Sequence, residues 1–282
     1  MAYHQPWRVL LTALGGLALG GLAMLAATGY QTEIAEWRHQ REEGLKRDGG
    51  WLTVAGLFWL HEGPNRFGKD PANEIALPDG PAEAGVFALH DGKVNVTMGG
   101  ETRELWPDSL DVAKVGRLSL FAIKRGDQYG IRLKDPESEY RRDFRGIEYY
   151  PPKPEYRVTA QFVAEPAKIP ILNILGQTES MESPGYVRFR LNGQDLRLRP
   201  VLEEPDAKEL FYIFRDQTSA RETYGAGRFL YSAMPKDGKV ELDFNKAYNP
   251  PCAFTPYATC PLPPAENRLA IRVEAGEKKY GH

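Results

Sequence analysis

The sequence predicts an all-β protein that follows a short N-terminal helical segment. From Trp51 onward, short apolar runs alternate with Gly, Pro, Asp and Asn, and no long stretch repeats with the 3.6-residue period of a helix. The dipeptide Asn192-Gly193 lies between two arms of alternating apolar and polar residues, which is a strong signal for an antiparallel hairpin. The 28 glycines and 22 prolines among 282 residues provide the many turns that such sheets need.

Composition and charge exclude some classes of protein. Hydrophobic residues make up 42% of the chain, and a chain of 282 residues can bury a large core. The 36 Lys and Arg residues are balanced by 38 Asp and Glu residues, so the net charge is −2. Because nucleic-acid binding depends on excess basic charge, we expect no nucleic-acid partner.

An apolar segment near the N-terminus predicts export and contact with a membrane. Residues 9–27 are apolar or small apart from Thr12, and Arg8 lies before them. Their length fits a membrane-spanning helix, whereas the small residues of Ala27-Thr28-Gly29 fit a signal-peptidase site. Residues 1–29 are therefore either a membrane anchor or a cleaved signal, and the sequence leaves both open. The basic charge before the run places the rest of the chain outside the cytoplasm, in the periplasm or at the cell surface.

A helix is predicted over residues 32–47. Thr32 is its N-cap, and Gly49-Gly50 ends it. Residues 30–50 are therefore expected to form a helical stalk that leads to the folded part of the chain.

The first β block is expected over residues 51–150. Turn signals at Asp91-Gly92 and Gly126-Asp127 separate pairs of apolar runs. The stiff sequence Pro-Pro-Lys-Pro at residues 151–154 marks the best internal boundary. The strands predicted in this block are residues 51–60, 86–89, 94–97, 118–123 and 129–133.

The second β block is expected over residues 151–282, and its clearest element is the hairpin at Asn192-Gly193. Pairing outward from the turn places Phe189 opposite Leu196 on a buried face and Arg188 opposite Arg197 on the other face. Like charges that face each other are unfavourable, so the arginine face is either a solvated surface or an anion site. The further strands predicted here are residues 210–218, 227–234 and 240–245, which continue the meander, and residues 269–273, which close the block. They form a barrel or a sandwich, and the sequence does not choose between the two.

Two cysteines, Cys252 and Cys260, are the whole cysteine content of the chain. In an exported chain the expected state is one disulfide, and the alternatives are a reactive or metal-binding pair and two free thiols. No CxxC, HxxH or HExxH motif is present, so we expect no metal site. The phosphate-binding motifs GxGxxG and GxxxxGK[ST] and the nucleophile motif GxSxG are also absent, so we expect no cofactor.

Polar residues gather between positions 214 and 268, where strand ends and loops commonly carry binding sites. The leading hypothesis is that this cluster binds a small polar or anionic ligand, with arginines as charge partners and tyrosines and asparagines to orient it. The candidate ligand-binding residues are Arg215, Asp216, Tyr224, Arg228, Asp243, Asn245, Tyr248 and Asn249.

Three other interpretations of the same residues stay open. The chain could be a hydrolase that uses Asp216, Asp243 or Glu266 as acid or base. It could be a structural or protein-interaction module of the cell envelope. In a third interpretation, the cluster only satisfies buried backbone groups around a disulfide-closed loop.

The sequence around the cysteines resembles a prokaryotic family of unknown function, the domain family numbered 1684. The resemblance lies in residues 243–254 (DFNKAYNPPCAF) and 260–267 (CPLPPAEN), which follow the YGAGR stretch of residues 224–228. It also takes in residues 51–60 (WLTVAGLFWL) and 68–73 (GKDPAN). The resemblance implies an uncharacterised, often exported protein, and it supplies no catalytic residues.

Part of the first block, within residues 51–135, also resembles a forkhead-associated (FHA) phosphothreonine-binding β-sandwich. The likeness lies in residues 65–79 (NRFGKDPANEIALPD), where Lys69 stands in the place of the usual arginine. Residues 81–85 (PAEAG) replace the Ser-x-x-His element of that family. The resemblance implies a similar sandwich, and the two departures weigh against phosphopeptide recognition.

Overall fold

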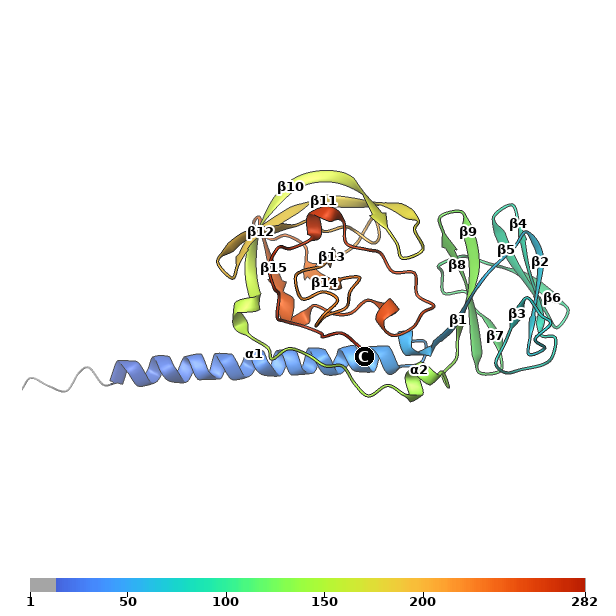
Figure 1. Cartoon of the computed structure of the whole chain (residues 1–282), viewed down its shortest axis with the longest axis horizontal. Helices are drawn as coiled ribbons and strands as arrows, with labels where there is room; N and C mark the ends of the chain where they lie inside the picture. Colours follow the sequence, from blue (N-terminus) through green and yellow to red (C-terminus); the bar gives the residue numbers. More distant parts are fainter. Residues whose placement is uncertain (1–13, 282) are drawn as a thin grey trace, which may run out of the picture.

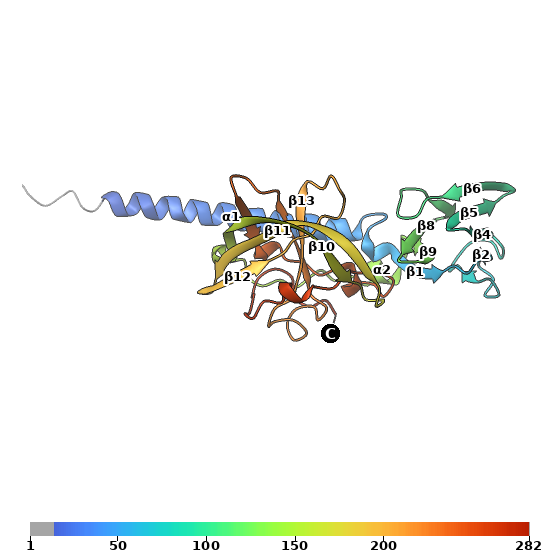
Figure 2. The same ribbon diagram turned by 90° about the horizontal axis from the view of Figure 1, so that it is seen from above.

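The computed structural model of the chain describes residues 14–281, with side chains from Gly29 onward. A long N-terminal helix, α1 (Leu14–Lys46), precedes two groups of β-sheets, which lie side by side in Figures 1 and 2. The other helices are short: α2 (Glu139–Arg142) and the 3-10 turns η1 (Trp51–Thr53), η2 (Pro154–Tyr156), η3 (Phe244–Lys246), η4 (Pro251–Ala253) and η5 (Ala265–Asn267).

The first block consists of two sheets that enclose one apolar core. One sheet has the order β1-β9-β8-β7, from β1 (Val54–Trp59), β9 (Gln128–Lys134), β8 (Leu118–Arg125) and β7 (Ala113–Val115). The other has the order β3-β2-β4-β5-β6, from β3 (Ile75–Ala76), β2 (Gly63–Gly68), β4 (Gly85–His90), β5 (Lys93–Met98) and β6 (Glu101–Leu105). Phe67 and Phe87 stack in this core with ring centroids 4.4 Å apart. The FHA likeness itself stays a prediction.

The second block packs a four-stranded sheet against a two-stranded one. The larger has the order β12-β11-β10-β15, from β12 (Gln194–Leu198), β11 (Thr178–Leu191), β10 (Arg157–Leu172) and β15 (Lys239–Asp243). The smaller pairs β13 (Glu209–Phe214) with β14 (Arg228–Ala233). Their shared core includes Phe189, Phe214 and Phe244. No sheet in the described part of the chain closes into a barrel, so that alternative is wrong.

The hairpin at Asn192-Gly193 is confirmed in its predicted register. Phe189 pairs with Leu196 and Arg188 pairs with Arg197. Asn192 and Gly193 have φ values of 50° and 78°, the left-handed conformation that a two-residue turn of this type requires.

Two strand predictions in the second block are wrong. Residues 269–273 form no strand, because only Arg268 makes a β-bridge there, although Leu269, Ile271 and Val273 still reach the core. The predicted meander also stops after β14, because β15 pairs with β10 and not with β14. The pattern missed β10 altogether, because prolines and charged residues interrupt its apolar positions and its pairing with β15 is a non-local contact.

The N-terminal helix is docked along the second block, beside which α1 runs in Figure 1. Ile34 and Leu45 are buried, and the Arg38 Nη2 donates to the Tyr150 carbonyl at 2.7 Å. A helix over the predicted residues is thus confirmed, but it begins at Leu14, so Thr32 lies within the helix and is not its N-cap. From Tyr30 onward the helix forms part of the folded body, where a stalk was expected.

The predicted membrane or signal segment lies mostly beyond what the structure describes. Residues 9–13 are outside the described residues, as are the side chains of residues 14–27. Among residues 14–281, no helix is both long and apolar enough to cross a membrane. The segment therefore stays a prediction.

The docking of α1 depends on a small polar contact at Tyr30. Its hydroxyl donates to Asp243 Oδ1 at 2.9 Å and accepts from Asn245 Nδ2 at 2.8 Å. Burial of Tyr30 and the nearby Asp243 charge raise the pKa of the tyrosine, so it stays a donor at neutral pH. Two of the predicted ligand-binding residues therefore hold the helix in place.

Replacing this hydroxyl is expected to destabilise the fold. Tyr30→Phe should lower the free energy of unfolding by about 1.5–3 kcal/mol, because the buried Asp243 carboxylate loses a donor. Urea unfolding measures the change. Tyr129→Phe is the control, since no hydrogen bond of that hydroxyl occurs among the described residues. Equal stability of the two variants would contradict the role given to Tyr30.

Candidate functional site

The predicted charge partner Arg228 lies inside the protein core. Only 1% of its surface is exposed, and its Nη2 pairs with Asp216 Oδ2 at 2.7 Å. The guanidinium also donates to the carbonyls of Val273 (2.9 Å) and Ala275 and lies 5.3 Å from the Phe214 ring centroid. Burial lowers the pKa of Arg228, and the Asp216 carboxylate opposes that shift. Arg228 therefore fastens β14 to the C-terminal segment.

The Asp216 carboxylate is also held by neighbouring groups of the protein. Its Oδ1 accepts from the Thr218 backbone N at 2.6 Å and from the Thr218 hydroxyl at 2.5 Å. The structure thus brings two predicted site residues together, Arg228 and Asp216, but as a buried ion pair that serves the fold.

A second closed cluster is built around Glu277, which the sequence reading did not single out. Glu277 is fully buried and accepts from Arg41 Nε at 2.9 Å and from the Asn249 backbone N at 2.7 Å. Gly276, with φ +77°, lets the chain approach this closely, because a Cβ there would lie 2.3 Å from the Ala247 carbonyl oxygen. Burial raises the pKa of Glu277, and the Arg41 charge opposes that rise. Asn249 donates its Nδ2 to the Lys278 carbonyl at 2.7 Å.

The remaining predicted residues are dispersed. Tyr224 donates its hydroxyl to the Cys252 carbonyl at 3.2 Å. Arg215 follows directly after β13, is partly exposed and forms a β-bridge with Arg268. Glu266 pairs with Arg199 at 3.1 Å. The three carboxylates of the hydrolase hypothesis, Asp216, Asp243 and Glu266, thus each have a structural partner, and none lines the cavities described below.

The disulfide is confirmed. Cys252 and Cys260 are bonded with their Cα atoms 6.2 Å apart, and the loop between them packs against η1 and the first block. Among the described residues, no group of three or more His, Cys, Asp or Glu could hold a metal ion.

A cavity of about 330 Å³ lies beside this disulfide, where α1, the first block and the second block meet. We call it the aromatic cavity; its lining residues are Arg41, Trp51, Arg125, Glu203, Phe211, Phe229, Tyr231, Tyr248, Pro251, Thr259, Cys260 and Pro261. Its size is in the range of small-molecule sites.

The wall of the aromatic cavity is a column of stacked rings. Phe211 stacks on Tyr231 at 4.9 Å, and Tyr231 lies 6.2 Å from Tyr248 with an angle of 13° between the two ring planes. The Arg41 guanidinium covers Tyr248 at 4.5 Å from the ring centroid. Such a surface favours a flat or apolar ligand body.

Two arginines add donors to this wall. Arg41 uses its Nε and Nη2 on Glu277 and the Asn249 carbonyl, and Arg125 uses its Nε and Nη1 on Thr259, Asp108 and Lys124. Arg41 Nη1 and Arg125 Nη2 take part in no hydrogen bond among the described residues. These two N–H₂ groups are available to an anion in the cavity.

Buried charge behind the wall strengthens the positive field. Arg132 is 9% exposed, lies 5.1 Å from the Trp51 ring centroid, and has no hydrogen-bond partner at Nε or Nη2. Its burial, with the nearby Arg125 charge, lowers its pKa to about 10, so it is still charged at neutral pH.

The cavity lining also includes one carboxylate, Glu203. Tyr231 donates its hydroxyl to Glu203 Oε2 at 2.5 Å. Burial raises the pKa values of Tyr231 and Tyr248, so both hydroxyls stay protonated and can donate. The cavity therefore has both cationic donors and a carboxylate that is paired with a phenol.

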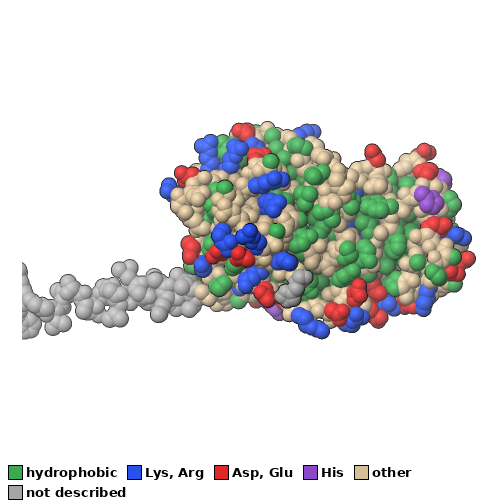
Figure 3. Space-filling model, viewed as in Figure 1, with side chains coloured by type: hydrophobic (Ala, Val, Ile, Leu, Met, Phe, Trp, Pro, Cys, Tyr) green, Lys and Arg blue, Asp and Glu red, His purple; other side chains and the backbone are tan. Residues whose placement is uncertain are grey.

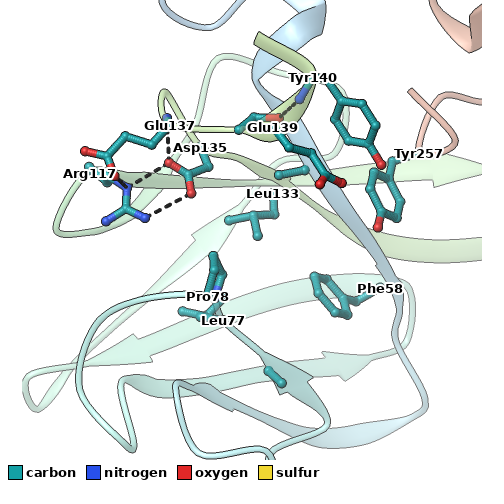
Figure 4. A pocket seen from close by; sticks show the side chains of 13 residues that line it. Phe58, Leu77, Pro78, Arg117, Leu133, Asp135, Glu137, Glu139, Tyr140 and Tyr257 are labelled. Atoms are coloured by element: carbon teal, nitrogen blue, oxygen red, sulfur yellow. Dashed lines mark hydrogen bonds and ion pairs between the residues drawn. The ribbon is translucent and has the colours of Figure 1, made fainter. Parts of the chain in front are cut away.

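A second pocket, of about 540 Å³, is shown in Figure 4. Phe58, Leu77 and Pro78 of the first block form one side, and Tyr140 and Tyr257 stand together at the other. The lining cation Arg117 is already held by Asp135 at 2.8 Å and by Asp79. This pocket therefore offers an anion fewer free donors than the aromatic cavity.

Sequence reasoning found only Tyr248 and the disulfide of the aromatic cavity. It missed Arg41, Arg125 and Tyr231, because each lies on a regular element where its residue type is ordinary. A signal existed only for Arg41, an arginine on the helix face that also carries Ile34 and Leu45, a face expected to be buried.

Fold and cavity define an all-β protein with a docked N-terminal helix and a small, partly cationic cavity. Residues 142–278 match the family described as "Protein of unknown function (DUF1684)", and the chain belongs to this family. The match begins after residues 51–60 and 68–73, which the resemblance had included.

A solved structure is also similar. It is the NMR structure of an uncharacterised protein of Haloarcula marismortui, 33% identical over 49% of this chain and 78% of that chain, with a TM-score of 0.42. The search of curated proteins found no matching relative.

Removing Arg228 is expected to unfold much of the population. Arg228→Met should cost about 3–5 kcal/mol of unfolding free energy, since Asp216 remains buried without its counter-charge. Arg215→Met is the matched control and should change stability by no more than about 0.5 kcal/mol. Chemical denaturation of both variants tests this; a stable Arg228→Met would show that the pair is dispensable.

Removing Arg41 should make stability depend more steeply on pH. Glu277 has a raised pKa when folded, so its contribution is complete below its ordinary pKa of about 4.5 and is lost as the pH rises through the raised value. Arg41→Gln raises that pKa further, because the opposing charge is gone. The variant should therefore be more destabilised at pH 8 than at pH 5, by about 1.4 kcal/mol per unit of added pKa shift. Thermal unfolding of Arg41→Gln and of the exposed control Arg47→Gln at both pH values is the measurement; an equal loss at both would contradict it.

Proposed function

We propose that this protein binds a small organic anion in the aromatic cavity. The observation that carries the proposal is the pair of unused guanidinium nitrogens, Arg41 Nη1 and Arg125 Nη2, beside a column of stacked rings. A ligand carboxylate would take hydrogen bonds from the two arginines, and its flat body would lie against Tyr231 and Tyr248.

Glu203 and its phenol partner would set the choice among anions. Together they favour a ligand with a hydroxyl or amino group at the end away from the carboxylate. The proposal keeps the ligand class expected from the sequence, a small polar or anionic molecule, and moves its charge partners from Arg215 and Arg228 to Arg41 and Arg125.

We also propose that the protein acts outside the cytoplasm. The disulfide supports this, since such bonds persist mainly in oxidising compartments. The apolar run of residues 9–27 supports it independently.

Titration with an aromatic carboxylate and its neutral amide tests the binding proposal. The full chain, kept in mild detergent, is expected to bind 2-naphthoate and to unfold at a higher temperature with it, whereas 2-naphthamide should have little effect. Arg125→Gln should weaken naphthoate binding roughly 10- to 100-fold, the usual value of a charge-assisted hydrogen bond.

The control is Arg141→Gln, which removes an arginine of similar exposure whose partners are Asp48 and Pro136, away from the cavity. Its affinity should equal that of the unaltered chain. Arg41 is not replaced in this binding test, because its loss would also leave Glu277 without its ion-pair partner. Equal binding of acid and amide, or an unaffected Arg125→Gln, would contradict the proposal.

A further inference from the structure

The outer face of the four-stranded sheet carries a line of polar residues across its strands, and three of the four are basic. Lys239 on β15 pairs with Gln161 on β10, Gln161 pairs with Arg188 on β11, and Arg188 pairs with Arg197 on β12. All four side chains are exposed, and no carboxylate occurs among them. We call these four residues the arginine row.

The neighbouring residues on the same face are neutralised, and the arginine row is not. Arg157 pairs with Glu241 at 2.7 Å, and Arg190 pairs with Asp195 at 3.6 Å. Arg188, Arg197 and Lys239 form no ion pair among the described residues. Two adjacent guanidinium groups therefore share one site whose lining carboxylate, Asp195, already pairs with Arg190, an arrangement that costs stability unless an anion occupies the site.

The arginines are held in place for such an anion. Arg188 Nη2 donates to the Tyr186 hydroxyl at 2.7 Å, and the Tyr186 ring lies 5.3 Å from the Arg188 guanidinium and 6.0 Å from that of Arg197. A depression of about 620 Å³ opens at this point, and its polar lining consists of Thr159, Gln161, both arginines and the Arg190–Asp195 ion pair. Arginine is well suited to phosphate because its planar fork donates two parallel hydrogen bonds.

The position of the row indicates which phosphate it meets. The β11–β12 hairpin lies at the end of the second block toward the N-terminal half of α1 in both Figure 1 and Figure 2, and Figure 3 shows Lys and Arg side chains gathered there. The apolar run of the sequence ends at Ala27, less than one helical turn before Tyr30, which is fixed to Asp243. A membrane that received this run would therefore lie next to the same end of the block.

We propose that the arginine row binds the phosphate groups of anionic phospholipids and so orients the second block on the membrane surface. The row is independent of the aromatic cavity. Binding by the row requires no insertion of side chains into the bilayer, because each basic residue near an anionic bilayer raises the affinity about fivefold by electrostatic attraction.

Sedimentation of the full chain with lipid vesicles tests this proposal. The measured quantity is the ratio of binding to vesicles of phosphatidylcholine mixed with phosphatidylglycerol over binding to phosphatidylcholine alone. That ratio cancels the contribution of the apolar run. We expect a preference for the anionic vesicles that weakens with salt and that falls roughly fivefold for each arginine removed in Arg188→Gln/Arg197→Gln.

The matched control is Arg141→Gln/Arg142→Gln, which removes the same charge from α2. It should keep the preference. An equal fall in both double variants would overturn the proposal in favour of net charge alone, as would an unaltered chain without any preference. Loss of the preference on adding inorganic phosphate, but not on adding chloride at equal ionic strength, would assign the row to a soluble phosphate and overturn the lipid as its occupant. The row variant should unfold at the same temperature as the unaltered chain or higher, because it removes a repulsion, so misfolding does not obscure the result.

Discussion

The buried contact between Arg41 and Glu277 is the interaction on which the rest of the structure depends. It joins the N-terminal helix to the C-terminal segment, and the same carboxylate holds the backbone of Asn249. A fully buried carboxylate is unfavourable unless it is paired, so α1 cannot leave the second block without exposing or protonating Glu277. This contact also places the Arg41 guanidinium over Tyr248 and thereby completes the cavity wall.

Structural and binding roles are divided among the arginines by how completely their donors are used. Arg228 is enclosed by Asp216 and two carbonyls, and Arg199 by Glu165 and Glu266, so both serve the fold. Arg41 and Arg125 have partners for part of each guanidinium only, and Arg188 has a phenol in place of a carboxylate. Unused donors beside a cavity, and not the presence of arginine itself, are what indicate an anion site.

The two blocks contribute unequally to these sites. Residues 142–278, which match the family, supply most of the aromatic cavity and the entire arginine row. The first block supplies Arg125, which reaches Thr259 of the disulfide loop at 2.8 Å. Arg125 also lines the cavity, so under the proposed function the first block would take part in ligand choice.

The sequence by itself determined the all-β class, the C-terminal part of the α1 helix, the register of the Asn192-Gly193 hairpin and the Cys252–Cys260 bond. Each of these depends on local signals: strand alternation, turn chemistry, helix punctuation and the presence of a single cysteine pair. Strand β10, the pairing of β15 with it, and the separation of Arg228 from Tyr248 were decided only by the tertiary structure. These features depend on contacts between residues far apart in the chain. The order of residues in the sequence does not show which polar side chains are enclosed and which are left with a free donor.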